Sequence, residues 1–233
     1  MIPKKIHQIY FNWQDKELHE IKLFSKSIET AKQINSDFEH KLWTEDECSD
    51  LVQNHYPQYD DFYHNLRYEI QKVDFIRFCI LHHEGGIYMD LDMHCINNFS
   101  PLLHNKIILH SIRHIKPKHN EKVINDFMAS MKGYKFWELT MRECLRNYRE
   151  KASKEIYDVW KGRFVLQTTG PKFLSRCIKK YMPNYEPKHI VWTKWRNDNW
   201  KGMNRDDYYI ECFRAGSWLT STNENLKAHD TFE

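Results

Sequence analysis

The 233-residue sequence lacks several features that mark specialised protein classes. Its apolar runs all stop well short of about 18 residues, the rough length that a membrane-spanning helix requires. Seven glycines and seven prolines are too few for a repeat or low-complexity protein. The formal net charge is only +3, which gives no strong electrostatic indication of nucleic-acid binding. We expect a single globular domain over residues 1–233, with no membrane span and no nucleic-acid partner.

None of the six cysteines lies in a C-x-x-C pair, so a structural zinc site is not expected. Cys79 lies on the apolar face of a predicted helix and Cys95 lies close to an acidic pair. Both are expected to be buried thiols, and free thiols are typical of a reducing compartment. The sequence begins directly with a predicted strand and shows no apolar signal segment. These features predict a cytoplasmic protein.

The most informative segment runs from residue 72 to residue 94. Apolar residues recur there at helical spacing until Gly85 and Gly86, one of which suits the left-handed residue that closes a helix. Asp74 and Arg77 lie at positions i and i+3 on this helix, so they are neighbours on its surface. A plain salt bridge on the helix face is the alternative role for this pair.

Two acids, Asp90 and Asp92, follow a short apolar stretch. Residues i and i+2 of a strand face the same way, so a strand over 87–92 would present both carboxylates together and turn Leu91 to the core. Hard carboxylate oxygens favour Mg²⁺ or Mn²⁺ over zinc, and magnesium typically binds one or two carboxylates together with substrate phosphates. The alternative is that residues 90–92 are simply a polar strand end or a turn.

Predicted strands and helices alternate along the rest of the chain. Further strands are predicted at 6–11, 39–44, 107–110, 190–192 and 208–213. Helices are predicted at 17–34, 44–55, 58–70, 72–83, 121–131, 136–149 and 171–182. This alternation predicts an α/β fold with helices on both faces of a sheet. Ligands of such sheets bind at the carboxyl ends of strands, where residues 10–13 and 90–92 fall.

Several blocks resemble the DXD-containing sugar transferases of glycosyltransferase family 32. Residues 74–77 (DFIR), 85–88 (GGIY) and 90–92 (DLD) are similar to the family signature, and residues 2–11 are similar to its first strand. Residues 40–44, 125–130, 169–171 and 216–218 are similar to further family blocks. The family includes initiating mannosyltransferases of the yeast type, bacterial capsule transferases and, more distantly, clostridial glucosylating toxins. The resemblance implies a GT-A type fold with a Rossmann-like mixed sheet.

The resemblance also implies roles for individual residues. Asp92 would bind Mn²⁺ or Mg²⁺, and Asp90 would reach the donor's ribose and sugar and, through water, the metal. Asp74 and Arg77 would hold hydroxyls of the donor sugar, so these four are the expected catalytic residues. Further contacts to the nucleotide sugar are expected from the matching blocks, namely His7, Ile9, Tyr10, Trp13, Tyr88, Asn125, Gly170, Ser217 and Trp218.

Some of these residues have a simpler alternative role. The side chains of the first strand can be plain core. Asn125 can cap the helix predicted at 121–131, because Asn is a preferred N-cap residue. The segment 169–171 can be a helix start, since Pro171 suits the first helical turn.

The sequence departs from the family at one position near the C-terminus. Many relatives carry a metal-binding His five or six residues before the Trp of the last block, whereas Cys212 stands near that position here. A thiolate is a poor partner for magnesium. Either Glu211 substitutes for the His, or fewer protein ligands hold the metal.

The resemblance implies a metal-dependent, retaining glycosyltransferase. It would move a hexose from a nucleoside-diphosphate sugar, a UDP- or GDP-sugar, to a hydroxyl of a glycan or glycoconjugate. Two other functions stay open. One is a metal-dependent phosphohydrolase that splits nucleotide sugars, although such enzymes usually gather more acids and histidines around two metals. The other is a catalytically idle nucleotide- or glycan-binding module, which the missing His before residues 217–218 suggests.

Overall fold

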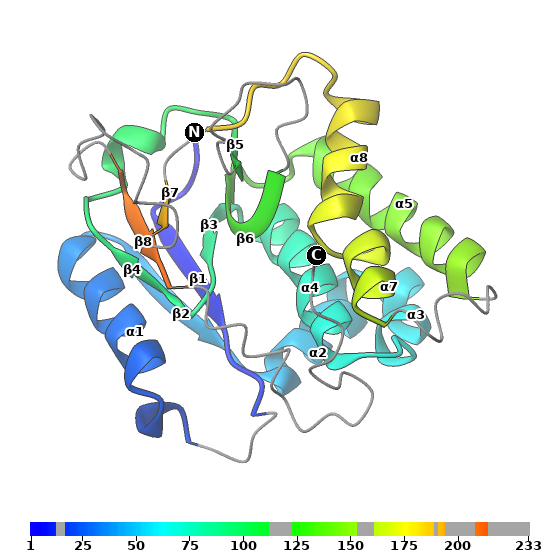
Figure 1. Cartoon of the computed structure of the whole chain (residues 1–233), viewed down its shortest axis with the longest axis horizontal. Coiled ribbons are helices and arrows are strands. Elements are labelled where there is room, and N and C mark those ends of the chain that lie inside the picture. Colours follow the sequence, from blue (N-terminus) through cyan, green and yellow to red (C-terminus); the bar gives the residue numbers. More distant parts are fainter. Residues whose placement is uncertain (13–16, 112–122, 153–160, 189–190, 194–207, 214–233) are drawn as a thin grey trace.

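The computed structural model describes residues 1–12, 17–111, 123–152, 161–188, 191–193 and 208–213. Its centre is a five-stranded sheet in the order β2-β1-β3-β6-β5 (Figure 1). The strands are β1 (Lys5–Ile9), β2 (Glu39–Trp43), β3 (Gly86–Met89), β5 (Ile107–Ser111) and β6 (Val123–Ser130). β1 is parallel to β2 and β3, whereas β6 is antiparallel to β3 and β5, so the sheet is mixed.

A second, three-stranded sheet begins just after the acidic pair. β4 (Met93–Cys95) is antiparallel to β8 (Ile210–Cys212), and β8 is parallel to β7 (Val191–Thr193). The segment from Asp90 to Asp92 is the turn between β3 and β4, so the chain passes from one sheet to the other there. The strand predicted over 87–92 is confirmed up to Met89, whereas its extension over 90–92 is wrong, because the chain leaves the large sheet after Met89. Leu91 is buried, as expected.

Helices cover both faces of the large sheet (Figure 1). One face carries α2 (Glu45–His55), α3 (Asp60–His64), α4 (Glu69–His83), α5 (Lys135–Ala152), α7 (Lys161–Thr168) and α8 (Pro171–Tyr181). The other carries α1 (Lys22–Ile34) and the small sheet. Short 3₁₀ turns lie at Leu18–Glu20, Pro57–Tyr59 and Ser100–Leu102.

Two apolar cores follow from the alternation of side chains along the strands. Tyr88 belongs to the core beneath the larger group of helices, and Ile87 belongs to the core beneath α1 and the small sheet. All six cysteines are free and buried, which confirms the expected buried thiols. The predicted α/β fold, with a mixed sheet and helices on both faces, is confirmed.

α4 leads directly to the acidic turn and is buried on all sides between Val73 and Leu81. Gly85 and Gly86 follow it with φ angles of 69° and 91°, the left-handed region that the sequence predicts at this helix end. A Cβ atom on Gly86 would lie 2.7 Å from the Lys5 carbonyl oxygen. The close approach of α4, β1 and β3 therefore depends on glycine.

The helix predicted over 121–131 is wrong, because these residues form the strand β6. Asn125 and Asp126 resemble the start of a helix locally. Pairing with β3 on one side and β5 on the other overrides that local signal. Asn125 is consequently not a helix cap. The predicted helix over 58–70 is also interrupted, since α3 ends at His64 and α4 begins at Glu69.

Candidate functional site

A buried group of polar side chains lies between α4 and the acidic turn. α4, β3, β6 and two turns contribute to it. We call this group the polar cluster, and its members are Asp74, Arg77, Tyr88, Asp90, Asn125 and Thr169. The structure therefore brings together the DFIR, GGIY and DLD blocks, together with residues from two blocks much later in the chain.

Arg77 is the centre of the polar cluster. Its Nη1 lies 3.2 Å from Oδ1 of Asp74 and donates a 3.0 Å hydrogen bond to the Asn125 carbonyl oxygen. Its Nη2 lies 3.0 Å from Oδ1 of Asp90. The guanidinium also lies 4.8 Å from the centre of the Tyr88 ring, a favourable cation–π geometry. The pair of Asp74 and Arg77 is thus part of a buried network, and not the plain salt bridge on a helix face.

Asp74 is held from three sides. Its Oδ1 accepts a 2.7 Å hydrogen bond from the Asn125 amide, and its Oδ2 accepts a 2.9 Å hydrogen bond from the Thr169 hydroxyl. Burial raises the pKa of Asp74 to about 6, although Arg77 and both hydrogen bonds oppose that rise. The carboxylate is consequently fixed in position, as a group that must recognise one orientation of a ligand should be.

Gly170 allows the turn before α8 to come close to Asp74. A Cβ atom there would lie 3.1 Å from Cα of Leu166 and 3.5 Å from Oδ2 of Asp74. Thr169, which the sequence marks only as part of the block 169–171, makes the direct contact. The signal that could have identified it is its place in that matching block, because its hydroxyl is the one side-chain donor that the block offers to a carboxylate.

Asp90 is oriented by protein groups. Its Oδ1 accepts a 2.5 Å hydrogen bond from the Tyr88 hydroxyl in addition to the contact with Arg77. Its backbone N–H donates to the Asp126 carbonyl oxygen at 2.9 Å. Burial raises the pKa of Asp90, and the Arg77 guanidinium and the Tyr88 hydroxyl oppose this rise. Its side chain is still 27% exposed, so one side of it is accessible to a ligand.

Asp92 lies at the other end of the turn. It is partly exposed, and its carbonyl oxygen accepts a 3.0 Å hydrogen bond from the Phe213 N–H. This bond connects the acidic turn to the segment after β8. The end of β8 therefore lies beside the acidic turn.

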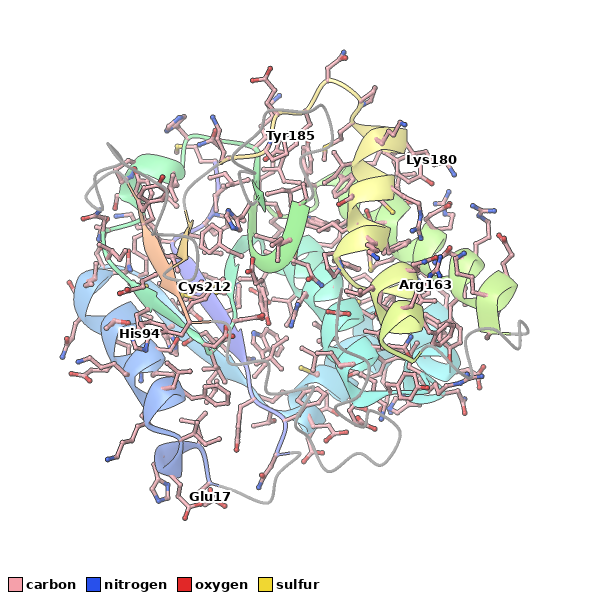
Figure 2. The ribbon with its side chains drawn as sticks, in the orientation of Figure 1. Glu17, His94, Arg163, Lys180, Tyr185 and Cys212 are labelled. Carbon is pink, nitrogen blue, oxygen red and sulfur yellow. The ribbon has the colours of Figure 1, made fainter. Side chains whose placement is uncertain are left out.

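The described residues contain no group of three or more His, Cys, Asp or Glu side chains that could hold a metal ion. Cys212, labelled in Figure 2, lies opposite Met93 in the small sheet and is buried in the apolar core, so its thiol does not extend the acidic pair. The side chains of Asp90 and Asp92 offer a metal ion only hard carboxylate oxygens. Such a pair fits Mg²⁺ or Mn²⁺ when phosphate oxygens and water supply the other ligands.

His7 of the first strand is held by contacts within the protein, and its nucleotide-binding role stays a prediction. His7 is buried, and its Nδ1 accepts a 3.1 Å hydrogen bond from the Trp43 indole while Nε2 donates to the Gly85 carbonyl oxygen at 2.9 Å. Burial lowers the pKa of His7 to about 4, so the ring is neutral near pH 7. Both ring nitrogens are thus bonded within the protein, and the structure places His7 in the core.

The other predicted nucleotide contacts divide into two sets. Ile9 is buried in the core, whereas Tyr10 is partly exposed and contacts Phe24 edge to face at 6.3 Å between ring centres. A nucleotide-binding role for these residues stays a prediction. The remaining set lies outside the described residues and comprises Trp13, Ser217 and Trp218.

Comparison with known sequences connects this geometry to a family. Residues 22–111 match the family described as a glycosyltransferase sugar-binding region containing a DXD motif. The chain is 29% identical over 222 residues to inositol phosphoceramide mannosyltransferase 3 of Schizosaccharomyces pombe, covering 94% of this chain and 56% of that protein. It is 30% identical over 189 residues to mannosyl phosphorylinositol ceramide synthase SUR1 of Saccharomyces cerevisiae, covering 81% and 45%. The chain spans about half the length of these curated relatives.

Solved structures with a similar fold are also glycosyltransferases. The PaToxG glycosyltransferase superposes with a TM-score of 0.57 at 20% identity, covering 78% of this chain and 70% of that one. Mouse xyloside xylosyltransferase 1 in its apo form superposes with a TM-score of 0.50 at 9% identity, covering 93% and 99%. At such identities the likeness shows the fold, and it confirms the predicted GT-A architecture. Among the described helices, none combines the length and the apolar character needed to cross a bilayer.

Proposed function

Because residues 22–111 belong to the family of glycosyltransferase sugar-binding regions with a DXD motif, we propose that this chain transfers a hexose from a nucleoside-diphosphate sugar to a glycan or glycoconjugate hydroxyl. UDP- and GDP-sugars are the proposed donors. Mannose is the first sugar to test, since the relatives at 29–30% identity are named for mannosyl transfer to inositol phosphoceramide. The observation that carries the proposal is the contact of Arg77 with Asp74 and Asp90 beside the acidic turn.

In this proposal the acidic turn holds the diphosphate end of the donor. Asp92, with Asp90 beside it, would bind Mn²⁺ or Mg²⁺, which when bound neutralises charge on the departing nucleoside diphosphate. Asp90 is already fixed by Arg77 and Tyr88, so it need not reorganise when the donor arrives. Its partly exposed side is the surface available to the donor.

Asp74 and Arg77 would recognise the donor sugar. A carboxylate has about four acceptor sites, and the contacts of Asp74 with Asn125, Thr169 and Arg77 leave capacity for a sugar hydroxyl. The rigid placement of these groups would orient the sugar toward the acceptor, which is the main contribution that a protein makes to such a transfer. Since the carboxylates of Asp74 and Asp90 are both paired with Arg77, we propose no covalent sugar–enzyme intermediate. We propose instead that transfer proceeds with retention, the leaving phosphate accepting the proton of the acceptor hydroxyl.

The test incubates the protein with Mn²⁺ and a panel of UDP- and GDP-sugars, with and without glycan and glycolipid acceptors. Release of intact nucleoside diphosphate that rises with acceptor supports the proposal. Release of nucleoside monophosphate and sugar phosphate would instead indicate the phosphohydrolase. No release and no binding of any donor would reject the transferase and favour the idle module.

Matched variants make the test specific for the acidic turn. Asp92→Asn removes one charge from the proposed metal pair and should abolish metal-dependent release. Asp37→Asn removes one charge from an exposed carboxylate that pairs with Lys4, and it should leave release unchanged. Full activity in Asp92→Asn would show that the proposed metal site is wrong.

A further inference from the structure

Positive charge is concentrated on three helices at one side of the molecule. α5, α7 and α8 contain eleven Lys and Arg residues against three acidic residues, all three on α5. The whole chain carries a net charge of only +3, so the rest of the chain is net acidic. The three helices pack against one another at the right of Figure 1, and Arg163 and Lys180 mark this side in Figure 2. The small net charge of the whole chain thus conceals a strong local excess of positive charge on these three helices.

The exposed cations form one row on α5 and one on α8. In both rows they recur at the three- and four-residue spacing that places side chains on one helix face. The opposite face of α8 is buried through Phe173, Leu174, Cys177 and Ile178, so the cations point outward. We call the two rows the basic face, which comprises Arg142, Arg146 and Arg149 on α5 and Lys172, Arg176, Lys179 and Lys180 on α8.

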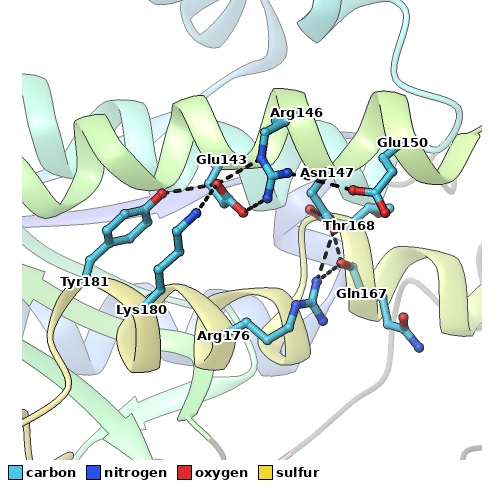
Figure 3. A network of polar contacts seen from close by, with 9 residues as sticks. All are labelled: Glu143, Arg146, Asn147, Glu150, Gln167, Thr168, Arg176, Lys180 and Tyr181. Carbon is cyan, nitrogen blue, oxygen red and sulfur yellow. Dashed lines mark hydrogen bonds and ion pairs between the residues drawn. The ribbon is translucent and has the colours of Figure 1, made fainter.

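The acids nearby do not balance the basic face. At the contact between α5 and α8, the carboxylate of Glu143 is shared by Arg146 and Lys180 and also accepts from the Tyr181 hydroxyl (Figure 3). Arg146 also lies 3.9 Å from Glu150, and Arg142 pairs with Glu138, so three carboxylates face the seven cations of the basic face. Arg176 donates only to neutral acceptors, namely the Gln167 carbonyl oxygen and the Asn147 side chain (Figure 3) and the Lys172 carbonyl oxygen.

Three further cations of the basic face have no acidic partner in the part of the chain that the structure describes. They are Arg149, Lys172 and Lys179, and all three are exposed. Uncompensated cations on adjacent helices produce a positive potential that attracts anionic groups. The face is therefore suited to a partner with many closely spaced negative charges.

The basic face begins beside the polar cluster. Thr169 donates to Asp74, Gly170 follows it, and α8 starts at Pro171. Lys172 is thus the second residue of a helix whose preceding turn contacts the candidate site. A partner bound along α8 would lie next to the approach to Asp74.

We propose that the basic face docks this chain on the surface of a membrane that contains anionic phospholipids. Closely spaced phosphates and carboxylates of such a surface complement two rows of cations. Among the described residues Met1 is the only exposed large hydrophobic side chain, so the described part of the basic face would meet the membrane through its charges and not by insertion. No described Phe, Tyr or Trp ring is exposed, which disfavours a single-stranded nucleic acid, because such partners stack their bases on aromatic side chains. An acceptor carried on a lipid would meet the polar cluster at this surface; that consequence rests on the proposed function, whereas the docking does not.

Flotation with liposomes tests the proposal without any need for enzymatic activity. The intact chain is mixed with phosphatidylcholine vesicles that contain about 30% phosphatidylserine, or with pure phosphatidylcholine vesicles, at about 0.05 M NaCl. The variant Arg149→Glu/Lys172→Glu/Lys179→Glu reverses the three unpaired cations and breaks no contact between described side chains. The matched control Lys22→Glu/Lys32→Glu/Lys106→Glu makes the same change in net charge at exposed positions on α1 and just before β5.

We expect the chain to bind the anionic vesicles only. The triple variant of the basic face should bind them with an affinity at least about a hundredfold lower, whereas the affinity of the control variant should change little. Raising NaCl to about 0.5 M should release the chain. Absent binding at low salt, or an equal loss in the control variant, would overturn the proposal. So would tighter binding of the same face to a labelled oligonucleotide or to polyglutamate than to the vesicles, because the partner would then be a nucleic acid or an acidic protein.

Discussion

Nη2 of Arg77 lies 3.0 Å from Oδ1 of Asp90, and this contact joins the buried helix α4 to the turn between the two sheets. Arg77 also holds Asp74 at 3.2 Å on the same helix. One guanidinium therefore sets the distance between the carboxylate proposed to recognise the sugar and the carboxylate proposed to face the metal. A substitution at Arg77 should therefore lower both the stability and the activity of the protein.

Arg77→Met should destabilise the protein strongly. It leaves Asp74 and Asp90 without their cation in a region where the Asp74 and Arg77 side chains are only 5% and 6% exposed. Removing one partner of a buried pair costs about 3–5 kcal/mol. Urea unfolding at pH 7 measures the loss, with Arg142→Met as control, because the exposed pair of Arg142 and Glu138 should contribute at most about 1 kcal/mol. Equal effects of the two substitutions would contradict the buried network.

Substitutions of the two acids of the turn should have different effects on stability but should both reduce activity. Asp90→Asn removes the charge that Arg77 and Tyr88 hold, so it should lower the free energy of unfolding by about 1–3 kcal/mol as well as reduce release of nucleoside diphosphate. Asp92→Asn should reduce release of nucleoside diphosphate but should change the free energy of unfolding by less than about 0.5 kcal/mol. Most substitutions at partly exposed positions have an effect of this size. Denaturant unfolding and single-turnover release, measured on the same samples, give the comparison. A large stability loss in Asp92→Asn would assign that residue a structural role.

Much of the architecture could be predicted because apolar periodicity is a local signal. α4 and the left-handed glycines after it follow from residues 72–86 alone. The sequence misassigns β6 because the second half of this strand is buried on both faces, which weakens the alternation, and because its Asn-Asp pair resembles a helix start. The turn at residues 90–92 was misassigned because nothing local tells that the chain changes sheets there.

The candidate site was predictable in its residues but not in its contacts. Blocks that resemble the family supplied Asp74, Arg77 and Asp90. The hydrogen bond from Thr169 to Asp74 spans 95 residues of sequence, and only the folded chain can bring such distant groups together. Similarly, the position of His7 in a block said little about its burial, which depends on Trp43 and Gly85.

Gly86→Ala should be far more damaging than Gly133→Ala. Both glycines have positive φ angles, 91° and 67°, so alanine is strained by about 1–2 kcal/mol at either position. A Cβ atom on Gly86 would also lie 2.7 Å from the Lys5 carbonyl oxygen and 2.9 Å from Nε2 of His7, whereas one on Gly133 meets nothing within 4 Å. Thermal and urea unfolding should show a loss of at least about 3 kcal/mol for Gly86→Ala. Similar losses in the two variants would contradict the close packing of β1 against β3.

Stability should fall as the pH is lowered from 6.5 toward 4, in part through His7. Burial lowers its folded pKa to about 4 from 6.5, so the unfolded chain binds the proton first and the contribution of His7, about 3 kcal/mol, is present above pH 6.5 and lost toward pH 4. Burial lowers the pKa of His40 to about 4 as well, with the same sign, whereas the raised pKa of Asp74 acts in the opposite direction.

Urea unfolding between pH 4.5 and pH 7 tests this expectation. His7→Gln should reduce the slope of stability against pH by about one proton, or ~1.4 kcal/mol per pH unit, and His7→Gln/His40→Gln should reduce it further. An unchanged slope in both variants would mean that neither histidine is held neutral by burial.

The turn from Asp90 to Asp92 is the covalent link between two sheets that pack on opposite sides of one core, and its ends are bonded to Asp126 and Phe213. Asp90 is therefore held by the large sheet and Asp92 by the small one. The distance between the two carboxylates depends on how the two sheets pack against each other. Mutations in the small sheet that touch no proposed ligand should consequently change the activity by moving one acid relative to the other.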